Sequence, residues 1–180
     1  MSNGLIPRRY AKALYKYAEE KGNTETVYTT MKALADAFKT NPDLQKVLAN
    51  PFVEKEDKEK LLVSAVGPDA PADYVDFVKL LLENKREEFT NLIAIAYCDL
   101  YRNLHHIARV TVTSATPLTG EQLDKIRTII DNAYKGWTVE LSTAVDPALI
   151  GGFVIDAGNN RLDASLSNEL DQLRLNLLRS

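Results

Sequence analysis

The sequence is poor in the features that would mark a secreted or membrane-spanning protein. Its one cysteine, Cys98, excludes an intramolecular disulfide and is typical of a reducing compartment. It has no run of about 18 apolar residues, so no segment is expected to span a membrane. Residues 1–9 place their charges after too short an apolar segment for a secretory signal. These absences predict a cytoplasmic protein without direct membrane insertion.

The sequence also lacks an excess of positive charge, because its net charge is -3 and neither half is basic. Binding to nucleic acid by counterion release needs clustered Lys and Arg. The dense charged run at residues 54–60 mixes both signs, so it is interpreted as a solvated helix face. Its Glu and Lys residues, such as Glu54 and Lys58, lie one turn apart on that helix. We therefore expect no nucleic-acid partner.

What the first half does contain is helical periodicity. Ile6, Tyr10, Leu14 and Tyr17 recur at spacings of three or four residues, and later segments repeat the pattern. Short breaks with Gly, Pro or Asn separate the apolar stripes. Six amphipathic helices with short connections predict a compact antiparallel bundle over residues 1–105.

The second half combines strand and helix patterns. A β-branched, alternating run at residues 109–114 predicts a strand. Thr119 and Gln122 have the spacing of a capping box and open a predicted helix. Two further strands flank a proline turn, and a leucine-rich terminal helix follows. The predicted fold class is therefore α+β, an N-terminal six-helix bundle followed by a small mixed α/β domain over residues 106–180.

The turn between those last two strands has a specific composition. Asp146 can accept a hydrogen bond from the backbone downstream, and Pro147 presets φ for a turn. Gly151 and Gly152 permit a positive φ or a bulge where the next strand begins. Gly158 ends that strand. These residues predict a tight backbone path into a buried strand.

No pairing of a nucleophile with a base stands out in the sequence. His105 and His106 are adjacent and lie on roughly opposite sides of the backbone, so we interpret them as a polar pair at the domain junction rather than as metal ligands. Cys98 lies in an apolar helical segment, which indicates a buried, inert thiol rather than a reactive one. We therefore expect no catalytic residue, no cofactor and no metal.

The glycine-rich segment at residues 151–161 allows an alternative, a phosphate-binding nest with Arg161 as a clamp. Neither the P-loop spacing nor the dinucleotide-binding spacing is present. The sequence supplies neither a base nor a cradle for a small phosphate-handling enzyme built on residues 159–163. A turn or bulge is the favoured interpretation, with Arg161 paired to Asp156 or Asp163.

Three predicted helices, the first, the fifth and the last, have more apolar surface than one core contact needs. The fifth, over residues 72–83, is either central in the bundle or presents its second face to an amphipathic helix of a partner. These surplus faces indicate an adaptor. One face of the fifth helix holds Tyr74, Phe77, Val78 and Leu81, and its adjacent face holds Val75, Val78 and Leu82. The main stripe of the last helix holds Leu166, Leu170, Leu173 and Leu177.

Short motifs run along nearly the whole chain. They are residues 9–14 (RYAKAL), 50–53 (NPFV), 81–86 (LLENKR), 112–118 (VTSATPL), 145–147 (VDP), 150–153 (IGGF) and 162–166 (LDASL). In this order they resemble the delta subunit of F-type ATP synthases, called the oligomycin-sensitivity-conferring protein in mitochondria. The signature positions of the resemblance are Asp146, Pro147, Gly151, Gly152, Gly158 and Asp163.

The resemblance implies a non-catalytic stator subunit of a proton-translocating F-type ATP synthase. Such a subunit links the alpha/beta catalytic head to the peripheral b-type stalk, so that rotation is coupled to ATP synthesis. In that complex the protein would be peripheral on the cytoplasmic face of the inner (plasma) membrane. A free-standing interaction module of unrelated function is the competing interpretation.

The resemblance also implies a partner for each half. The N-terminal bundle would bind an N-terminal helix of an alpha subunit in a groove between its first and fifth helices. The C-terminal domain would hold the C-terminal end of the b-type stalk subunit. We expect the groove to be lined by Tyr10, Leu14, Val75, Val78, Lys79 and Leu82.

Overall fold

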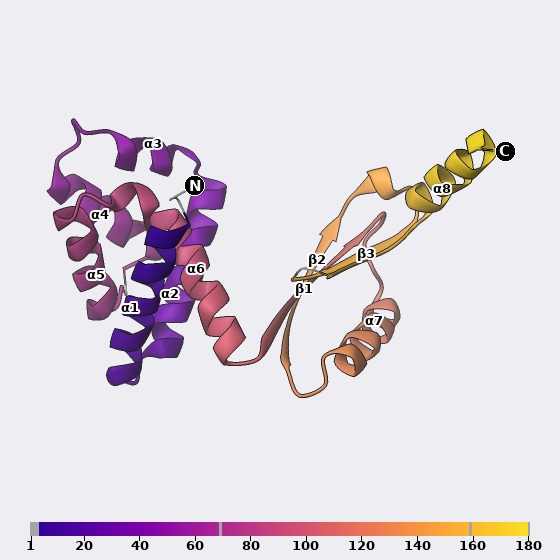
Figure 1. Cartoon of the computed structure of the whole chain (residues 1–180), viewed down its shortest axis with the longest axis horizontal. Coiled ribbons are helices and arrows are strands. Elements are labelled where there is room, and N and C mark those ends of the chain that lie inside the picture. Colours follow the sequence, from indigo (N-terminus) through magenta and orange to yellow (C-terminus); the bar gives the residue numbers. More distant parts are fainter. Residues whose placement is uncertain (1–3, 69, 159, 180) are drawn as a thin grey trace. The chain divides into compact units, whose positions relative to one another are not determined.

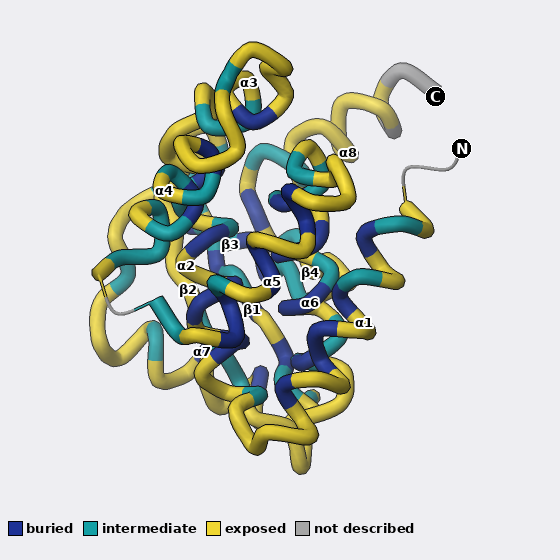
Figure 2. Tube along the Cα trace, turned by 90° about the vertical axis from the view of Figure 1, so that its left-hand side faces the viewer, coloured by how far each residue is buried: buried dark blue, intermediate teal, exposed yellow. Residues whose placement is uncertain are grey.

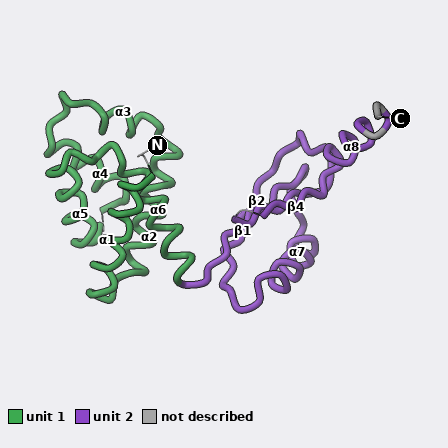
Figure 3. The backbone as a smooth tube through the Cα atoms, viewed as in Figure 1, with its two compact units in different colours: residues 1–104 green, residues 105–180 purple. Residues whose placement is uncertain are grey.

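The computed structural model forms two compact units, Met1–Leu104 and His105–Ser180 (Figure 3). Helices build the first unit, and a sheet with helices builds the second, which confirms the predicted α+β class. The division lies beside the expected boundary, while independent folding of each unit stays a prediction. The structure describes residues 4–68, 70–158 and 160–179, so residues 1–3 and Asn159, which appear in the predictions above, lie outside the described part.

Unit 1, which ends at Leu104, consists of helices joined by short connections (Figure 1). Gly22 and Gly67 follow its first and fourth α-helices with φ of 71° and 103°, which glycine adopts without strain. The elements of unit 1 are α1 (Leu5–Glu20), α2 (Thr24–Thr40), α3 (Asp43–Ala49), α4 (Lys55–Val66), α5 (Ala72–Glu83), the 3-10 helix η1 (Glu87–Phe89) and α6 (Thr90–Leu104).

The core of unit 1 lies where α6 packs against α1 and α2. Met31 of α2 and Ile93 and Tyr97 of α6 are fully buried there. The hydroxyl of Tyr97 donates a hydrogen bond to the backbone oxygen of Thr24 over 3.2 Å, so burial leaves it satisfied. The next residue, Cys98, is buried, as expected.

The interpretation of residues 54–60 as a wholly solvated helix face is wrong at Lys58. This lysine is only 4% exposed. Its Nζ lies 2.8 Å from Oε1 of Glu87, whose side chain is also mostly buried. Lys60 lies 3.7 Å from Asp57 at the surface. A lysine stem can pack along apolar surface while its ammonium reaches a carboxylate, and the partner here is too distant in sequence to be predicted from helix spacing.

Unit 2 contains, among its described residues, a sheet of four strands in the order β2-β1-β3-β4. β1 pairs in parallel with β2 and antiparallel with β3, and β4 pairs antiparallel with β3. The sequence patterns predict only the first three, because β4 is a polar strand at the sheet edge. The elements are β1 (Ile107–Ser114), α7 (Gly120–Ala133), β2 (Thr138–Val145), the 3-10 helix η2 (Pro147–Leu149), β3 (Gly152–Ala157), β4 (Asn160–Ser165) and α8 (Leu166–Arg179).

The core of unit 2 lies between the sheet and α7. Val110 and Val112 alternate along β1 toward one face, where Ile126 of α7 is buried with them. The side-chain oxygen of Gln122 accepts a hydrogen bond from the backbone of Thr119 over 2.9 Å, at the predicted start of α7. α8 follows β4 directly, and its described side chains are mostly exposed (Figure 2).

Candidate functional site: apolar docking surfaces

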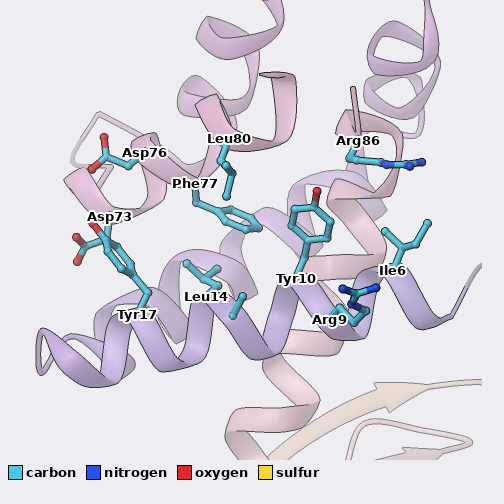
Figure 4. A pocket seen from close by; sticks show the side chains of 11 residues that line it. Ile6, Arg9, Tyr10, Leu14, Tyr17, Asp73, Asp76, Phe77, Leu80 and Arg86 are labelled. Atoms are coloured by element: carbon cyan, nitrogen blue, oxygen red, sulfur yellow. The ribbon is translucent and has the colours of Figure 1, made fainter. Parts of the chain in front are cut away.

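A groove with a volume of about 730 Å³ runs between α1 and α5 in unit 1 (Figure 4). At its centre the rings of Tyr10 and Phe77 meet edge to face with centroids 6.5 Å apart. Leu14 and Phe77 are buried at the base, whereas Leu80 is 47% exposed at the rim. The groove is lined by Ile6, Arg9, Tyr10, Ala13, Leu14 and Tyr17 from α1, by Asp73, Asp76, Phe77 and Leu80 from α5, and by Arg86 beyond α5.

Acidic and basic side chains line opposite ends of the groove, and because Asp73 is paired with Lys21, the exposed carboxylate at the acidic end is that of Asp76. Asp73 and Asp76 lie at the end where Tyr17 is found, and Arg9 and Arg86 lie at the other end (Figure 4). This separation gives the groove a direction, because a bound helix also has a positive N-terminal end and a negative C-terminal end.

Asp73 is held by the end of α1 and the connection to α2. The ammonium of Lys21 and the side-chain amide of Asn23 donate hydrogen bonds to its carboxylate, at 2.6 Å and 2.9 Å. The hydrogen bond from Lys21, followed by that from Asn23, holds the pKa of Asp73 below its ordinary value. The Asp73 carboxylate therefore stays charged and fixes α5 beside α1.

Only Tyr10 and Leu14 of the six residues expected to line the groove do so. Val75, Val78, Lys79 and Leu82 lie on another face of α5. They are offset by two positions from the groove-lining set Asp73, Asp76, Phe77 and Leu80, which is a rotation of about 200° on a helix of 3.6 residues per turn.

The offset face of α5 is packed into unit 1 only in part, because Lys79 on that face is exposed. Val78 and Leu82 are buried, and Nζ of Lys79 lies 4.0 Å from Oε1 of Glu59 on α4. The fifth helix is packed within unit 1, as one alternative expected, and acceptance of a partner helix by a second face stays a prediction. The face that lines the groove combines Asp73 and Asp76 with Phe77 and Leu80, so apolar periodicity could not identify it. Partner binding by the six residues stays a prediction.

A second apolar surface lies on α8 in unit 2. We call it the leucine stripe, defined as Leu166, Leu170, Leu173 and Leu177. These side chains are 47%, 54%, 59% and 78% exposed, so the chain itself leaves them largely uncovered. Their spacing of four, three and four residues places them along one side of the helix, as in the seam of a coiled coil. The stripe is therefore an exposed apolar seam with coiled-coil spacing.

The predicted proline turn positions the start of α8. Oδ1 of Asp146 accepts a hydrogen bond from the backbone of Ala148 over 2.9 Å, and Pro147 opens η2. Gly152 has φ of 74°, and a Cβ there would collide with the backbone oxygen of Ala164 in β4. Only glycine fits this close approach between β3 and β4.

Gly151 and Asp163 complete the connection to α8. A Cβ at Gly151 would lie 2.6 Å from Cδ1 of Leu166, so the missing side chain makes room for the first leucine of the stripe. Oδ1 of Asp163 accepts hydrogen bonds from the Ser165 hydroxyl at 2.6 Å and the Ser165 backbone at 3.1 Å. These bonds lower the pKa of Asp163. The Ser165 hydroxyl in turn accepts from the backbone of Asn168 at 3.3 Å, which caps α8.

The structure also places Gly158, Arg161 and His106, which the sequence analysis singled out. Gly158 has φ of 59° at the end of β3. Arg161 lies 3.9 Å from Asp156 and 3.5 Å from Asp163, so both of the expected ion pairs are present. His106 contacts the ring of Trp137 at 5.1 Å between centroids.

The described part of the chain lacks both a cluster of metal-ligating side chains and a membrane-spanning helix. No group of three or more His, Cys, Asp and Glu residues there could hold a metal ion. No helix in the same residues is long and apolar enough to span a membrane. The features that stand out are instead the α1–α5 groove and the exposed leucine stripe, one on each unit of a two-unit α+β protein.

Comparison with known proteins agrees with this class and is more specific. The family model for "ATP synthase delta (OSCP) subunit" matches residues 6–177. The ATP synthase subunit delta of Phocaeicola vulgatus is 40% identical over 172 residues, which are 95% of this chain and 92% of the relative. That of Parabacteroides distasonis is 39% identical over 181 residues, 99% of this chain and 98% of the relative. The chain therefore belongs to the ATP synthase delta subunit family, which confirms the resemblance seen in its motifs.

A solved structure shows the same fold. A chain of the Toxoplasma gondii mitochondrial ATP synthase hexamer, determined by cryo-electron microscopy, superposes with a TM-score of 0.74 at 22% identity. The match covers 96% of this chain and 97% of that one. Both units are therefore found together in a single chain of that complex.

Proposed function

We propose that this chain is the non-catalytic stator subunit that joins the catalytic head of a proton-translocating F-type ATP synthase to its peripheral stalk. One observation supports this most directly: each unit has its own uncovered apolar surface, the α1–α5 groove in unit 1 and the leucine stripe in unit 2. A connector that resists torque needs two separate, long-lived contacts. Nanomolar binding at each corresponds to about 12 kcal/mol.

The α1–α5 groove binds an amphipathic helix from the N-terminus of an alpha subunit. Leu14 and Phe77 at the base suit the apolar side of such a helix, and Tyr10 offers a ring edge beside them. The dipole of the bound helix favours its N-terminus near Asp76 and its C-terminus near Arg86. In this orientation the bound helix runs parallel to α5.

The leucine stripe binds the C-terminal end of the b-type stalk subunit. That end supplies a helix whose apolar residues repeat at the spacing of the stripe. Through these two contacts the protein is peripheral on the cytoplasmic face of the inner (plasma) membrane, because it belongs to a complex that is anchored there.

The two competing interpretations have less support. A free-standing interaction module of unrelated function is disfavoured by the family match over residues 6–177. A phosphate-handling enzyme needs a guanidinium available for an anion, whereas Arg161 already lies beside two carboxylates, Asp156 and Asp163. Asn159 of that hypothetical loop lies outside the described residues.

A bridging experiment tests the proposal. Purified head should be retained on immobilised b-type stalk subunit only when the full-length chain is added. Leu80→Asp places a charge at the groove rim, at a side chain that is 47% exposed, and should weaken head binding at least tenfold without affecting stalk binding. Leu104→Asp is the matched control, because Leu104 is 52% exposed and does not line the groove. Retention of the head without the chain, or equal head affinity of Leu80→Asp, would contradict the proposal.

A further inference from the structure

Ile150 occupies the centre of a strained turn between η2 and β3. Its backbone has φ of 64° and ψ of -40°. The backbone N–H of Gly151 donates a hydrogen bond to the oxygen of Leu149 over 2.7 Å, which closes a γ-turn around Ile150. The positive-φ form of this turn is the rarer and more strained one, and positive φ is especially unfavourable for a β-branched residue.

Neither local conformation nor burial within the described structure explains an isoleucine at this position. Glycine would adopt the turn freely, and two glycines follow immediately, of which Gly152 has a positive φ of 74°. The Ile150 side chain is 65% exposed, so only a small part of its apolar surface is removed from water. A backbone outlier that holds an exposed apolar side chain points to a role outside the chain's own core.

The position of Ile150 links it to the leucine stripe. The next residue, Gly151, accepts a hydrogen bond from the backbone of Leu166 over 3.1 Å. The Leu166 side chain also packs directly over Gly151. Ile150 is therefore fixed beside the first turn of α8, at the end of the stripe where that helix begins.

We propose that Ile150 is a preorganised anchor of the stalk interface, whose side chain packs against the stalk helix that covers the leucine stripe. This inference rests on the proposed function of unit 2. The γ-turn fixes the backbone of Ile150 and the direction of its Cα–Cβ bond before binding, so no backbone freedom has to be lost there when the stalk helix docks. An exposed apolar residue next to the glycine that contacts the first leucine of the stripe is suitably placed to act as a binding hot spot.

The charges beside the stripe specify the occupant further. In the heptad frame defined by the four leucines, Glu169 and Arg174 flank the seam, and both are exposed. The stalk helix should therefore carry a basic residue opposite Glu169 and an acidic residue opposite Arg174. Its apolar residues, at the same four-and-three spacing, fill the seam and reach Ile150.

Substitution of Ile150 by glycine separates binding from folding. Ile150→Gly removes the side chain and relieves the turn, so the thermal midpoint of the full-length chain should stay unchanged or rise. Its dissociation constant for the soluble b-type stalk subunit should increase at least tenfold, mainly through faster dissociation. Ile150→Asn, which also tolerates positive φ, should behave in the same way. Head binding should not change.

Ile129→Ala is the matched control, because Ile129 is 53% exposed in the same unit but lies on α7. Its stalk affinity should remain within a factor of about two of wild type. Equal stalk affinity of Ile150→Gly and wild type would overturn the inference alone. A lowered thermal midpoint would also overturn it, because Ile150 would then be a packing residue.

Two further outcomes concern the occupant of the stripe. Absence of stalk binding by the wild-type chain would overturn the proposed function of unit 2 together with this inference. Self-association of the chain that Ile150→Gly abolishes, measured by sedimentation, would identify a second copy as the occupant and overturn the stalk assignment.

Discussion

Nζ of Lys21 lies 2.6 Å from Oδ1 of Asp73 and connects the end of α1 to the first turn of α5. These two helices form the walls of the groove in unit 1. The ion pair therefore fixes the separation of the walls at one end, while Tyr10 and Phe77 fix it at the centre. The Asp73 carboxylate therefore contributes to the stability of unit 1.

The stability of unit 1 should consequently fall at acidic pH. The hydrogen bonds from Lys21 and Asn23 hold the folded-state pKa of Asp73 below its unfolded value. A lowered carboxyl pKa stabilises the fold above the unfolded pKa, and this contribution is lost as pH falls through the folded pKa. The loss should begin below about pH 4. Thermal unfolding at several pH values should show a smaller acid-induced decrease for Asp73→Asn than for wild type.

Two comparisons make this prediction specific. The hydrogen bond to Asp73 raises the pKa of Lys21, so while Asp73 is ionised the Lys21 contribution is lost only under strongly alkaline conditions. Asp76→Asn, at an exposed position on the same helix, should retain the wild-type acid dependence. Identical acid profiles for Asp73→Asn and wild type would show that the ion pair does not contribute to stability.

The buried ion pair between Lys58 and Glu87 leads to a second prediction. Lys58→Ala leaves the mostly buried Glu87 carboxylate without its cation, which should lower the free energy of unfolding by about 3 kcal/mol. Replacing both residues, as in Lys58→Met with Glu87→Leu, should restore about wild-type stability. Lys60→Ala is the surface control. Urea unfolding gives the free energy of unfolding of all three variants. A decrease in Lys58→Ala no larger than in Lys60→Ala would contradict the prediction.

Local sequence signals predicted those parts of the fold that depend on neighbouring residues. Thr119 and Gln122 indicated the start of α7, and Asp146 and Pro147 indicated the turn before β3. Both signals are reliable because a capping box and a proline turn form hydrogen bonds within a few residues. The pairing of Lys58 was not predictable in this way, since its partner lies on another element.

Local sequence signals also failed to predict two features of the candidate site, the lining of the groove and the strained turn at Ile150. The face of α5 that lines the groove carries Asp73 and Asp76 beside Phe77, so the apolar pattern of the helix does not identify it. The glycines at positions 151 and 152 suggested that positive φ would occur at a glycine. Gly152 does have a positive φ. Ile150 has a positive φ as well, because the η2 turn must close before the chain enters β3.

The charge separation in the groove predicts the orientation of the bound helix. A spin label at the N-terminal end of an alpha-subunit N-terminal peptide should broaden the amide signals of Tyr17 and Asp73 in the nuclear magnetic resonance spectrum of the chain. A label at the C-terminal end of the peptide should broaden those of Ile6 and Arg86 instead. The reverse pattern would contradict an orientation set by the helix dipole.

The last prediction concerns the close approach of β3 to β4. Gly152 has positive φ, and a Cβ there would meet the backbone oxygen of Ala164, which cannot move without displacing β4. Gly152→Val should therefore lower the free energy of unfolding of unit 2 by about 3 kcal/mol, more than an ordinary substitution. Trp137, the only tryptophan, provides a fluorescence signal for that unit. Gly120→Ala, where a Cβ meets no atom within 4 Å, should be neutral or slightly stabilising.

The damage from Gly152→Val should extend to assembly because β4 leads directly into α8. A displaced β4 moves Ser165, whose hydroxyl caps α8, and with it the first leucine of the stripe. Stalk binding and coupled ATP synthesis should therefore fall, while ATP hydrolysis by the detached head persists. Normal stability and assembly of Gly152→Val, combined with loss of a nucleotide-binding activity of the purified chain, would contradict both the structural role of this glycine and the stator function.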